Sequence, residues 1–253
     1  MVEKIEADLS KEYLFRLFSG LTSEERTYIG LMGGWAVEFT LNKIKVTHIG
    51  SKDIDIFFNT EKISAERVIE IIESRGFLKH SFFRWCKYIN RENGKEMSED
   101  EQRRCDLHNI IPVYVDVMTN KDLGGGRLFF EPLLDDVLEG EFEYFNYRGI
   151  DIMMPTTKLI TELKIKTACE RNDQEKRSKD IADLFSIINN SKTMWELDLK
   201  GNLIRIANIR EDLRKMFSEK FDEFLSDGTI SKGSNLINVD EKTVISMLRL
   251  IFA

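Results

Sequence analysis

Two aspartates in the first half of the chain are spaced so that their carboxylates could share one cation. Asp53 and Asp55 alternate with apolar residues in the segment 53–58, and this period of two is typical of a β-strand with one buried face. Both carboxylates then lie on one side of the strand, about 5 to 7 Å apart. At an effective dielectric of about 20, their repulsion is on the order of 3 kcal/mol, which favours a cation between them. A hard divalent ion such as Mg²⁺ suits this place, because it accepts one or two carboxylates and keeps positions for phosphate oxygens and water.

A pair of glycines upstream could supply the phosphate-binding half of such a site. Gly33 and Gly34 follow the apolar run 28–32 and precede a segment with helical spacing. Glycine has no Cβ to block a close approach, and the free amides at the start of a helix can hold an anionic phosphate. Ser51 and Lys52 directly precede the two aspartates. We therefore expect the glycine turn to hold an anionic phosphate, with Ser51 and Lys52 as further candidates for this phosphate cradle.

The order of a strand, a glycine pair, a helix and a strand with Asp-x-Asp resembles the nucleotidyltransferase superfamily, whose fingerprint is Gly-Gly or Gly-Ser followed by two carboxylates. The resemblance implies an α+β fold in which helices flank a mixed β-sheet. It also implies Mg²⁺ or Mn²⁺ as cofactor, an NTP as substrate, and a third carboxylate from a neighbouring strand. Asp116 is preferred for this role, since it alternates with valines in the segment 113–118. Asp106 is the alternative. Asp53, Asp55 and Asp116 are then both the metal ligands and the catalytic residues.

Two helical stretches add a second resemblance. The segments 155–164 and 177–184 look like the lysine-bearing helix and the Lys-Asp-x-x-Asp-Leu helix of the abortive-infection toxin type nucleotidyltransferases. On that likeness Lys164 reaches the triphosphate, and Asp180 or Asp183 orients the nucleotide or the lysine. The same likeness implies a toxin role and an antitoxin protein as partner.

The helical phase leaves the choice of lysine open. Lys164 and Lys166 flank one apolar stripe on opposite sides, so either could reach a cleft. Pairing of these lysines and the two aspartates on helix surfaces is the competing interpretation. The chain departs from the toxin pattern in the polar stretch between Ile89 and Arg104, which leaves the acceptor open among a tRNA end, a small molecule and a protein hydroxyl.

Strand and helix patterns divide the chain into two parts. Residues 1–150 mix strands and helices and form the expected nucleotidyltransferase-like catalytic domain, whereas residues 151–253 form a mainly helical domain. The polar segment 91–102 is expected to be the exposed tip of a long hairpin. Further expected strands are 77–80, 82–90, 103–109, 112–118, 142–147 and 150–154, and the expected helices are 9–18, 65–74, 156–169, 179–190, 209–225 and 240–252.

Composition narrows the classes of protein. With 253 residues, of which 42% are hydrophobic, the chain can bury a sizeable core. Its net charge of −7 argues against a general nucleic-acid coat, although a local basic groove stays open. No apolar run approaches the roughly 20 residues of a membrane span. Three cysteines are too few for a disulfide framework, which favours a reducing cytoplasm.

These features predict a Mg²⁺-dependent nucleotidyltransferase that moves a nucleoside monophosphate from an NTP to an acceptor hydroxyl and releases pyrophosphate. The alternative is a binding module on the same fold that holds a nucleotide or a protein and has lost catalysis. The presence of all three carboxylates favours the enzyme.

Overall fold

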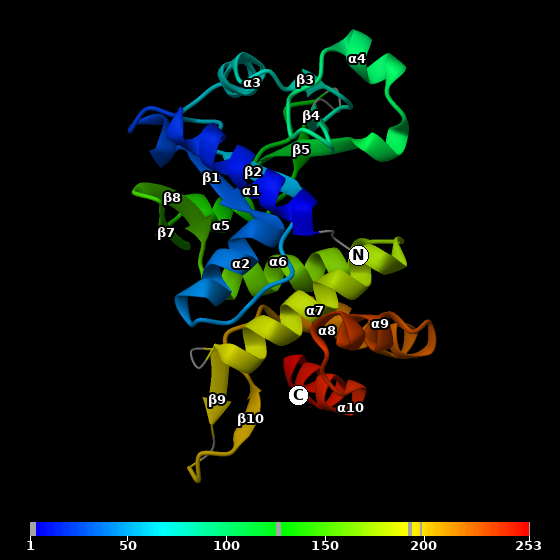
Figure 1. Cartoon of the computed structure of the whole chain (residues 1–253). Helices are drawn as coiled ribbons and strands as arrows, with labels where there is room; N and C mark the ends of the chain where they lie inside the picture. The colour runs from blue at the N-terminus through cyan, green and yellow to red at the C-terminus, as the bar shows by residue number, and fades with distance from the viewer. Residues whose placement is uncertain (1–3, 125–127, 192–193, 198, 253) are drawn as a thin grey trace. The chain divides into compact units, whose positions relative to one another are not determined.

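The computed structural model describes residues 4–124, 128–191, 194–197 and 199–252 (Figure 1). The chain forms two compact units, the first made of Met1–Ala36 and Gly50–Pro155 and the second of Val37–Ile49 and Thr156–Ala253. This division falls after Pro155 rather than at the expected residue 150, because the last strand of the first unit continues to Pro155. The stretch 37–49, expected in the first domain, belongs to the second unit.

The first unit is built on one mixed sheet. Its elements are α1 (Lys4–Ser19), η1 (Glu25–Thr27), β1 (Ile29–Met32), the start of α2 (Gly33–Lys43), β2 (Asp53–Phe58), α3 (Ala65–Ser74), β3 (Leu78–Lys79), β4 (Arg84–Asn90), α4 (Glu99–Arg104), η2 (Leu107–Asn109), β5 (Ile110–Thr119), β6 (Phe129–Phe130), α5 (Leu134–Leu138), β7 (Phe142–Tyr147) and β8 (Ile150–Pro155). Within the described residues, eight strands form the sheet, with the order β3-β4-β5-β2-β1-β8-β7 and β6 beside β5. Strand β2 is parallel to β5 and antiparallel to β1, so the sheet is mixed.

The period-two pattern of the central strands explains the sheet. In β2 the side chains of Ile54 and Ile56 are fully buried, whereas the intervening aspartates are partly exposed. Strand β5 alternates in the same way, with buried Val113, Val115 and Val117. Helix α1 crosses β2, β5 and β8 on the apolar side (Figure 1). The other face carries Asp53 and Asp55 of β2 and Tyr114 and Asp116 of β5.

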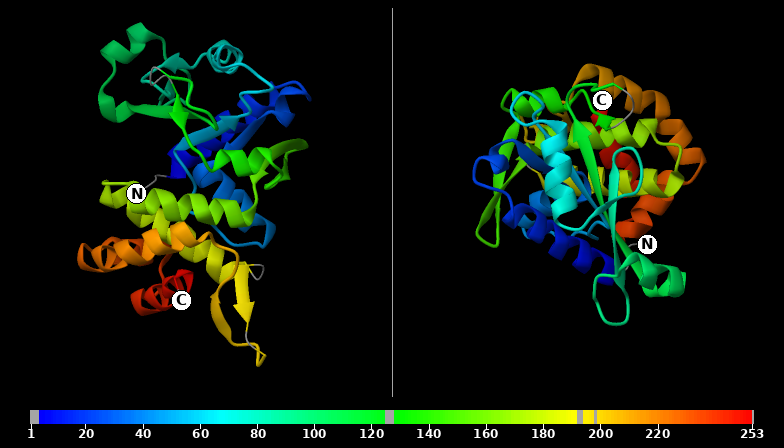
Figure 2. Two further views of the ribbon diagram at one scale, coloured as in Figure 1. Left: turned by 180° about the vertical axis from the view of Figure 1, so that it is seen from behind. Right: turned by 90° about the horizontal axis from the view of Figure 1, so that it is seen from above.

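The second unit is mainly helical. Its elements are the rest of α2, α6 (Thr157–Glu170), α7 (Gln174–Asn190), β9 (Trp195–Leu197), β10 (Leu203–Ile206), α8 (Glu211–Ser226), α9 (Thr229–Ile237), α10 (Glu241–Leu248) and η4 (Arg249–Ile251). Helices α7 and α9 pack closely, since a Cβ on Gly233 would lie 2.9 Å from the backbone oxygen of Ser178. Phe217 and Phe224 of α8 are fully buried in the core of this unit. The β9–β10 hairpin extends from these helices (Figure 2).

The expected fold class is confirmed: a mixed sheet flanked by helices is followed by a helical C-terminal region. The expected strand 103–109 is wrong, because the chain there forms α4 and η2 instead. Ser98 starts α4 with a capping box, in which its side chain accepts from the amide of Glu101 and that carboxylate accepts from the amide of Ser98. The polar stretch expected as a hairpin tip therefore contains a helix. The structure adds α5, β6, β9, β10 and α9, which the sequence patterns did not predict.

None of the helices in the described ranges combines the length and the apolar character that crossing a bilayer requires.

Candidate active site

Strand register brings the three predicted carboxylates to one face of the sheet. Asp55 of β2 lies directly opposite Asp116 of β5, and Asp53 lies opposite Tyr114. Side chains at paired positions of neighbouring strands point to the same face. Asp53, Asp55 and Asp116 therefore form one group, which we call the carboxylate cluster.

The glycine turn lies directly against this cluster. Strand β1 pairs with β2 so that Met32 is opposite Asp55, and Gly33 follows at the start of α2. Gly33 has a φ of +66°, and a Cβ there would lie 1.9 Å from Asp55 Oδ2. Gly34 stands in the first turn of α2. The glycine at position 33 is therefore required by both its backbone angle and the space that the Asp55 carboxylate occupies.

An arginine that sequence reasoning missed joins the carboxylates. Arg84 donates from Nε to Asp116 Oδ1 and from Nη2 to Asp116 Oδ2, both at 2.6 Å, and its Nη2 lies 3.4 Å from Asp53 Oδ2. Its guanidinium also lies 4.5 Å from the centre of the Tyr114 ring. The hydrogen bonds to Asp116 raise the pKa of Arg84 above its already high ordinary value. The guanidinium of Arg84 is therefore the cation that compensates the repulsion between the carboxylates of Asp53 and Asp116.

The sequence does place Arg84 near the start of the predicted strand 82–90. It does not tell which strand lies beside this one. Only the register of β4 on β5, with Arg84 opposite Asp116, puts the side chain in the cluster. A strand shifted by one residue would have turned the guanidinium to the other face.

The residues of the cluster fit a hard divalent ion by their chemistry. All three carboxylates offer hard oxygen ligands, and the side chains of Asp53 and Arg84 are 32% and 23% exposed, so the cluster is open to solvent. As the side chains stand, no three His, Cys, Asp or Glu residues in the described ranges are gathered closely enough to hold a metal. An ion would therefore need Arg84 to release part of its hold on the carboxylates.

The remaining candidates of the first unit are Ser51, Lys52 and Asp106. Ser51 is buried just before β2, and Lys52 Nζ lies 2.5 Å from Glu6 Oε2 of α1. Asp106 is exposed at the start of η2. Strand β5 begins only at Ile110, roughly 20 Å along the sheet from Asp116 at about 3.3 Å per residue. The structure thus brings Asp116 to Asp55 and leaves Asp106 outside the cluster.

Comparisons with known proteins bear on the fold. No family model and no curated protein matches the sequence. The structure is similar to the crystal structure of an antigenic nucleotidyltransferase-like protein from Paracoccidioides brasiliensis, with a TM-score of 0.54 and 16% sequence identity. The match covers 88% of this chain and 93% of that chain. This fold is nucleotidyltransferase-like. At so low an identity the likeness concerns the fold alone.

The second unit holds the other predicted residues in a buried group. Lys164 Nζ lies 2.8 Å from Asp180 Oδ1 and 2.6 Å from Asp183 Oδ2, and both aspartates are 1% exposed. Arg171 Nη1 lies 2.6 Å from Asp180 Oδ2, and His48 Nε2 lies 2.8 Å from Asp183 Oδ1. We call these five residues the lysine cluster. Pairing on helix surfaces is therefore wrong for Lys164 and its two aspartates.

Charges within the lysine cluster compensate one another. Burial raises the pKa of Asp183, but the charge of Lys164 and the interaction with His48 hold that pKa well below its usual range. Burial likewise opposes the charge on Lys164, and the two aspartates nevertheless hold its pKa above the ordinary value. Lys166 is half-buried. Asp180 and Asp183 both pair with Lys164.

Proposed function

We propose that this chain is a Mg²⁺- or Mn²⁺-dependent nucleotidyltransferase that moves a nucleoside monophosphate from an NTP to an acceptor hydroxyl and releases pyrophosphate. The observation that carries the proposal is the carboxylate cluster beside Gly33. Asp53 and Asp55 of β2 and Asp116 of β5, which is opposite Asp55, share one face of the sheet, and Asp55 lies against a glycine turn that opens a helix. The nucleotidyltransferase-like fold supports the same reading.

The transfer is a single displacement at the α-phosphorus. The acceptor hydroxyl oxygen forms a bond to that phosphorus, the bond from phosphorus to the oxygen bridging the β-phosphate breaks, and its electron pair leaves with pyrophosphate. Asp116 takes the hydroxyl proton. Divalent ions held by Asp53, Asp55 and Asp116 would neutralise the charge that develops on the attacking and leaving oxygens.

The other residues bind and orient the nucleotide. The amides of Gly33 and Gly34 face the phosphates from the start of α2, where the helix dipole also favours negative charge. Ser51 and Lys52 complete this phosphate cradle once Lys52 leaves Glu6. Arg84 keeps the carboxylates compensated before the nucleotide arrives, and its released N–H groups then suit a phosphate oxygen.

The lysine cluster enters the proposal through the toxin-type resemblance. Asp180 and Asp183 hold and orient Lys164, the lysine that on this likeness serves the triphosphate. An antitoxin protein as partner and a toxin role belong to this same part of the proposal.

The test is transfer of label. The full chain is incubated with each α-³²P-labelled NTP, Mg²⁺ and a cell extract, which is then separated into RNA, protein and small molecules. We expect label in one fraction, and none with the Asp53→Asn/Asp55→Asn double variant. Mg²⁺ plus NTP should also raise the Tm of the wild type by mass action but not that of the double variant. Asp106→Asn is the matched control, because it removes an exposed carboxylate outside the cluster.

A catalytically inactive binding module is the second candidate, and one observation favours it. Arg84 already supplies a cation to Asp116 and Asp53 without any metal. A module of this kind would bind NTP with the same affinity with and without Mg²⁺, and it would transfer label to no fraction of any extract.

A further inference from the structure

A hollow of about 450 Å³ lies in the first unit between β3, β4 and the α4–η2 segment. Its size falls in the range of small-molecule sites. Cys86 and Tyr88 of β4 line its floor, and Leu78, His80, Arg103 and Leu107 line its sides. The helix α4 that forms part of its wall belongs to the stretch in which the chain departs from the toxin-type pattern.

Strand register puts this hollow on the same face of the sheet as the carboxylate cluster. Asp53 lies opposite Tyr114, Tyr114 opposite Cys86, and Cys86 opposite Leu78. Paired positions share one face, and neighbouring strands are about 4.8 Å apart. The floor of the hollow at Cys86 is therefore two strands, about 10 Å, from the strand that carries Asp53.

Aromatic side chains connect the two places. The rings of His80 and Tyr114 lie 5.6 Å apart, and the guanidinium of Arg84 covers Tyr114 on the side of the cluster. Tyr88 Oη lies 3.5 Å from His80 Nδ1. A planar ring entering the hollow would meet His80 and Tyr88, which line it, and stacking of a nucleic-acid base on an aromatic side chain strengthens binding considerably.

The rim of the hollow combines exposed apolar and charged side chains. Leu107 is 86% exposed and Leu78 is 49% exposed, so two large apolar side chains stand at an opening with little cover. The floor carries no negative charge at physiological pH, because burial raises the pKa of the Cys86 thiol to about 11 and that of Tyr88 to about 12. At the edge Arg103 lies 3.7 Å from Glu99, so these two add one charge of each sign, and Lys79 adds a positive charge. An uncharged ring with a phosphate attached matches this lining.

The chemistry of the transfer says which reactant would use the hollow. Along the sheet the order is β3-β4-β5-β2-β1, so the glycine turn after β1 lies on one side of the cluster and the hollow on the other. In phosphoryl transfer the attacking and leaving oxygens are roughly in line through the phosphorus. If Gly33 and Gly34 hold the leaving phosphates, the acceptor enters from the side of β4.

We propose that the hollow beside β4 is the acceptor subsite and that it binds the planar heteroaromatic ring of a nucleoside, whose hydroxyl then faces Asp116. This inference rests on the proposed function, since it concerns the acceptor of that reaction. The nucleoside is either free or the end of an RNA chain, and Arg103 would pair with a phosphate only in the second case.

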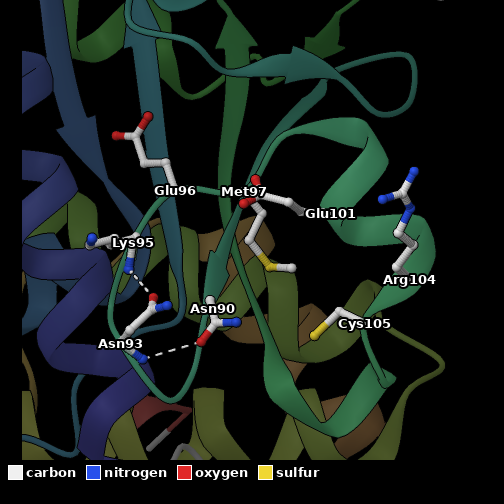
Figure 3. Close-up of a pocket in the computed structure, with 8 residues that line it drawn as sticks. All are labelled: Asn90, Asn93, Lys95, Glu96, Met97, Glu101, Arg104 and Cys105. Carbon is white, nitrogen blue, oxygen red and sulfur yellow. Dashed lines mark hydrogen bonds between the residues drawn. The ribbon is translucent and has the colours of Figure 1, made fainter.

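A second hollow offers a matched control. Figure 3 shows it, with a volume of about 350 Å³ and a lining that includes Asn90, Asn93 and Arg104. Asn90 Oδ1 there accepts from the amide of Asn93, and Glu96 pairs with Lys87, which lies outside the lining. Arg103 and Arg104 are neighbours on α4 but line different hollows. Replacing either one removes the same charge from the same helix.

The experiment measures binding of defined probes to the full chain by calorimetry. Adenosine, ribose and a ribo-trinucleotide are titrated with and without Mg²⁺ and a non-hydrolysable NTP analogue. We expect adenosine to bind and ribose not to bind, with the NTP analogue leaving adenosine affinity unchanged or higher. Leu107→Asp and His80→Ala should each weaken adenosine binding at least about tenfold, and circular dichroism confirms that each is folded. Arg104→Ala should leave the affinity unchanged.

The Arg103→Ala variant tells the two sources of the nucleoside apart. If it weakens binding of the trinucleotide but not of adenosine, the acceptor is an RNA end. If it binds the trinucleotide and adenosine with the affinities of the wild type, the acceptor is a free nucleoside.

Three outcomes would overturn the subsite: equal binding of ribose and adenosine, equal loss in Arg104→Ala and Leu107→Asp, or competition between adenosine and the NTP analogue, which would assign the hollow to the base of the donor. Binding of the NTP analogue with Mg²⁺ but of no nucleoside removes the subsite and leaves the proposed function in place. If neither Mg²⁺ nor the analogue binds, the proposed function itself fails, and the acceptor role of the hollow fails with it.

Discussion

Each unit of the molecule holds a cation between two aspartates, and the two arrangements differ in exposure. In the first unit Arg84 joins Asp116 and Asp53 at the surface of the sheet, where solvent reaches both Arg84 and Asp53. In the second unit Lys164 joins Asp180 and Asp183 in the interior. The same pairing of charges therefore has two different physical consequences.

Burial decides whether a cation can be exchanged. Removing one partner of a buried ion pair leaves an uncompensated charge in a medium of low dielectric, which costs several kcal/mol. A partly exposed pair is screened by water, so a partner can be replaced by another cation or by solvent at a smaller cost. The lysine cluster thus joins α6, α7 and the 37–49 segment of the second unit, whereas the carboxylate cluster can bind a substrate ion.

The largest expected effect is on the buried side of this comparison. Asp183→Asn should lower the free energy of unfolding by about 3 kcal/mol, because it removes a charge that Lys164 and His48 both face. Urea unfolding at pH 7 measures the loss. In the Lys164→Met/Asp183→Leu double variant, which removes both charges, the loss should be smaller than in Asp183→Asn. A loss below about 1 kcal/mol in Asp183→Asn would mean that the lysine cluster is not a stabilising buried group.

The pH dependence follows from the lowered pKa of Asp183. The ionised carboxylate stabilises the fold at pH values above the unfolded-state pKa of about 4 and loses this effect as the pH falls through the lower folded-state value. The unfolding free energy of the wild type should therefore decline below about pH 5. The decline should be shallower in Asp183→Asn, which has no carboxylate to protonate.

The exposed side is tested through Asp116. Asp116→Asn should reduce label transfer at least about 10²-fold, the usual scale for general-base assistance, while much of the NTP affinity is kept. Parallel measurements of NTP binding and of transfer separate the two effects. Full activity in Asp116→Asn would mean that Asp116 is not the third carboxylate. The role would then pass to Asp106, although the structure places Asp106 before the start of β5 and outside the cluster.

Sequence reasoning reached the elements of the site more easily than its contacts. Alternation along β2 and β5 predicted Asp53, Asp55 and Asp116 on polar faces, since period two depends on local order alone. Arg84 stayed hidden because its place depends on how β4 registers on β5, which residues far apart in the chain decide. The burial of Lys164 and Asp180 could not be predicted for a similar reason. The periodicity of each helix does not determine which faces of the two helices pack together.

In the polar segment 91–109 the sequence pattern predicted the wrong local structure. Its charges indicated an exposed hairpin tip, yet Ser98 and Glu101 form a capping box that starts a helix there. The prediction used only the charge of this segment and did not consider these two residues as a helix start. Here a signal of four neighbouring residues decides the local structure.

The glycine turn gives a smaller effect that ties the backbone to the cluster. Gly33→Ala should destabilise the fold by about 1–2 kcal/mol through its left-handed backbone, and the added Cβ should displace the Asp55 carboxylate. The Mg²⁺-dependent rise of Tm with NTP should then be lost. Gly94→Ala is the matched control, because Gly94 has a φ of +68° and nothing within 4 Å of its added Cβ. If both variants keep the Tm response, Gly33 is an ordinary turn residue.

The smallest expected effect sharpens the comparison most, because it asks whether the cation of the exposed cluster is exchangeable. Arg84→Gln should raise the affinity for Mg²⁺ alone about tenfold, equivalent to about 1.4 kcal/mol, since Asp116 and Asp53 are then free of the competing guanidinium. Calorimetric titration of Mg²⁺ measures this without any activity. Arg103→Gln makes the same change of net charge at an exposed position of the same unit and should leave the affinity unchanged. If the Mg²⁺ affinity of Arg84→Gln is equal to or lower than that of the wild type, Arg84 does not compete with a metal. The carboxylate cluster would then resemble the lysine cluster in keeping its own cation.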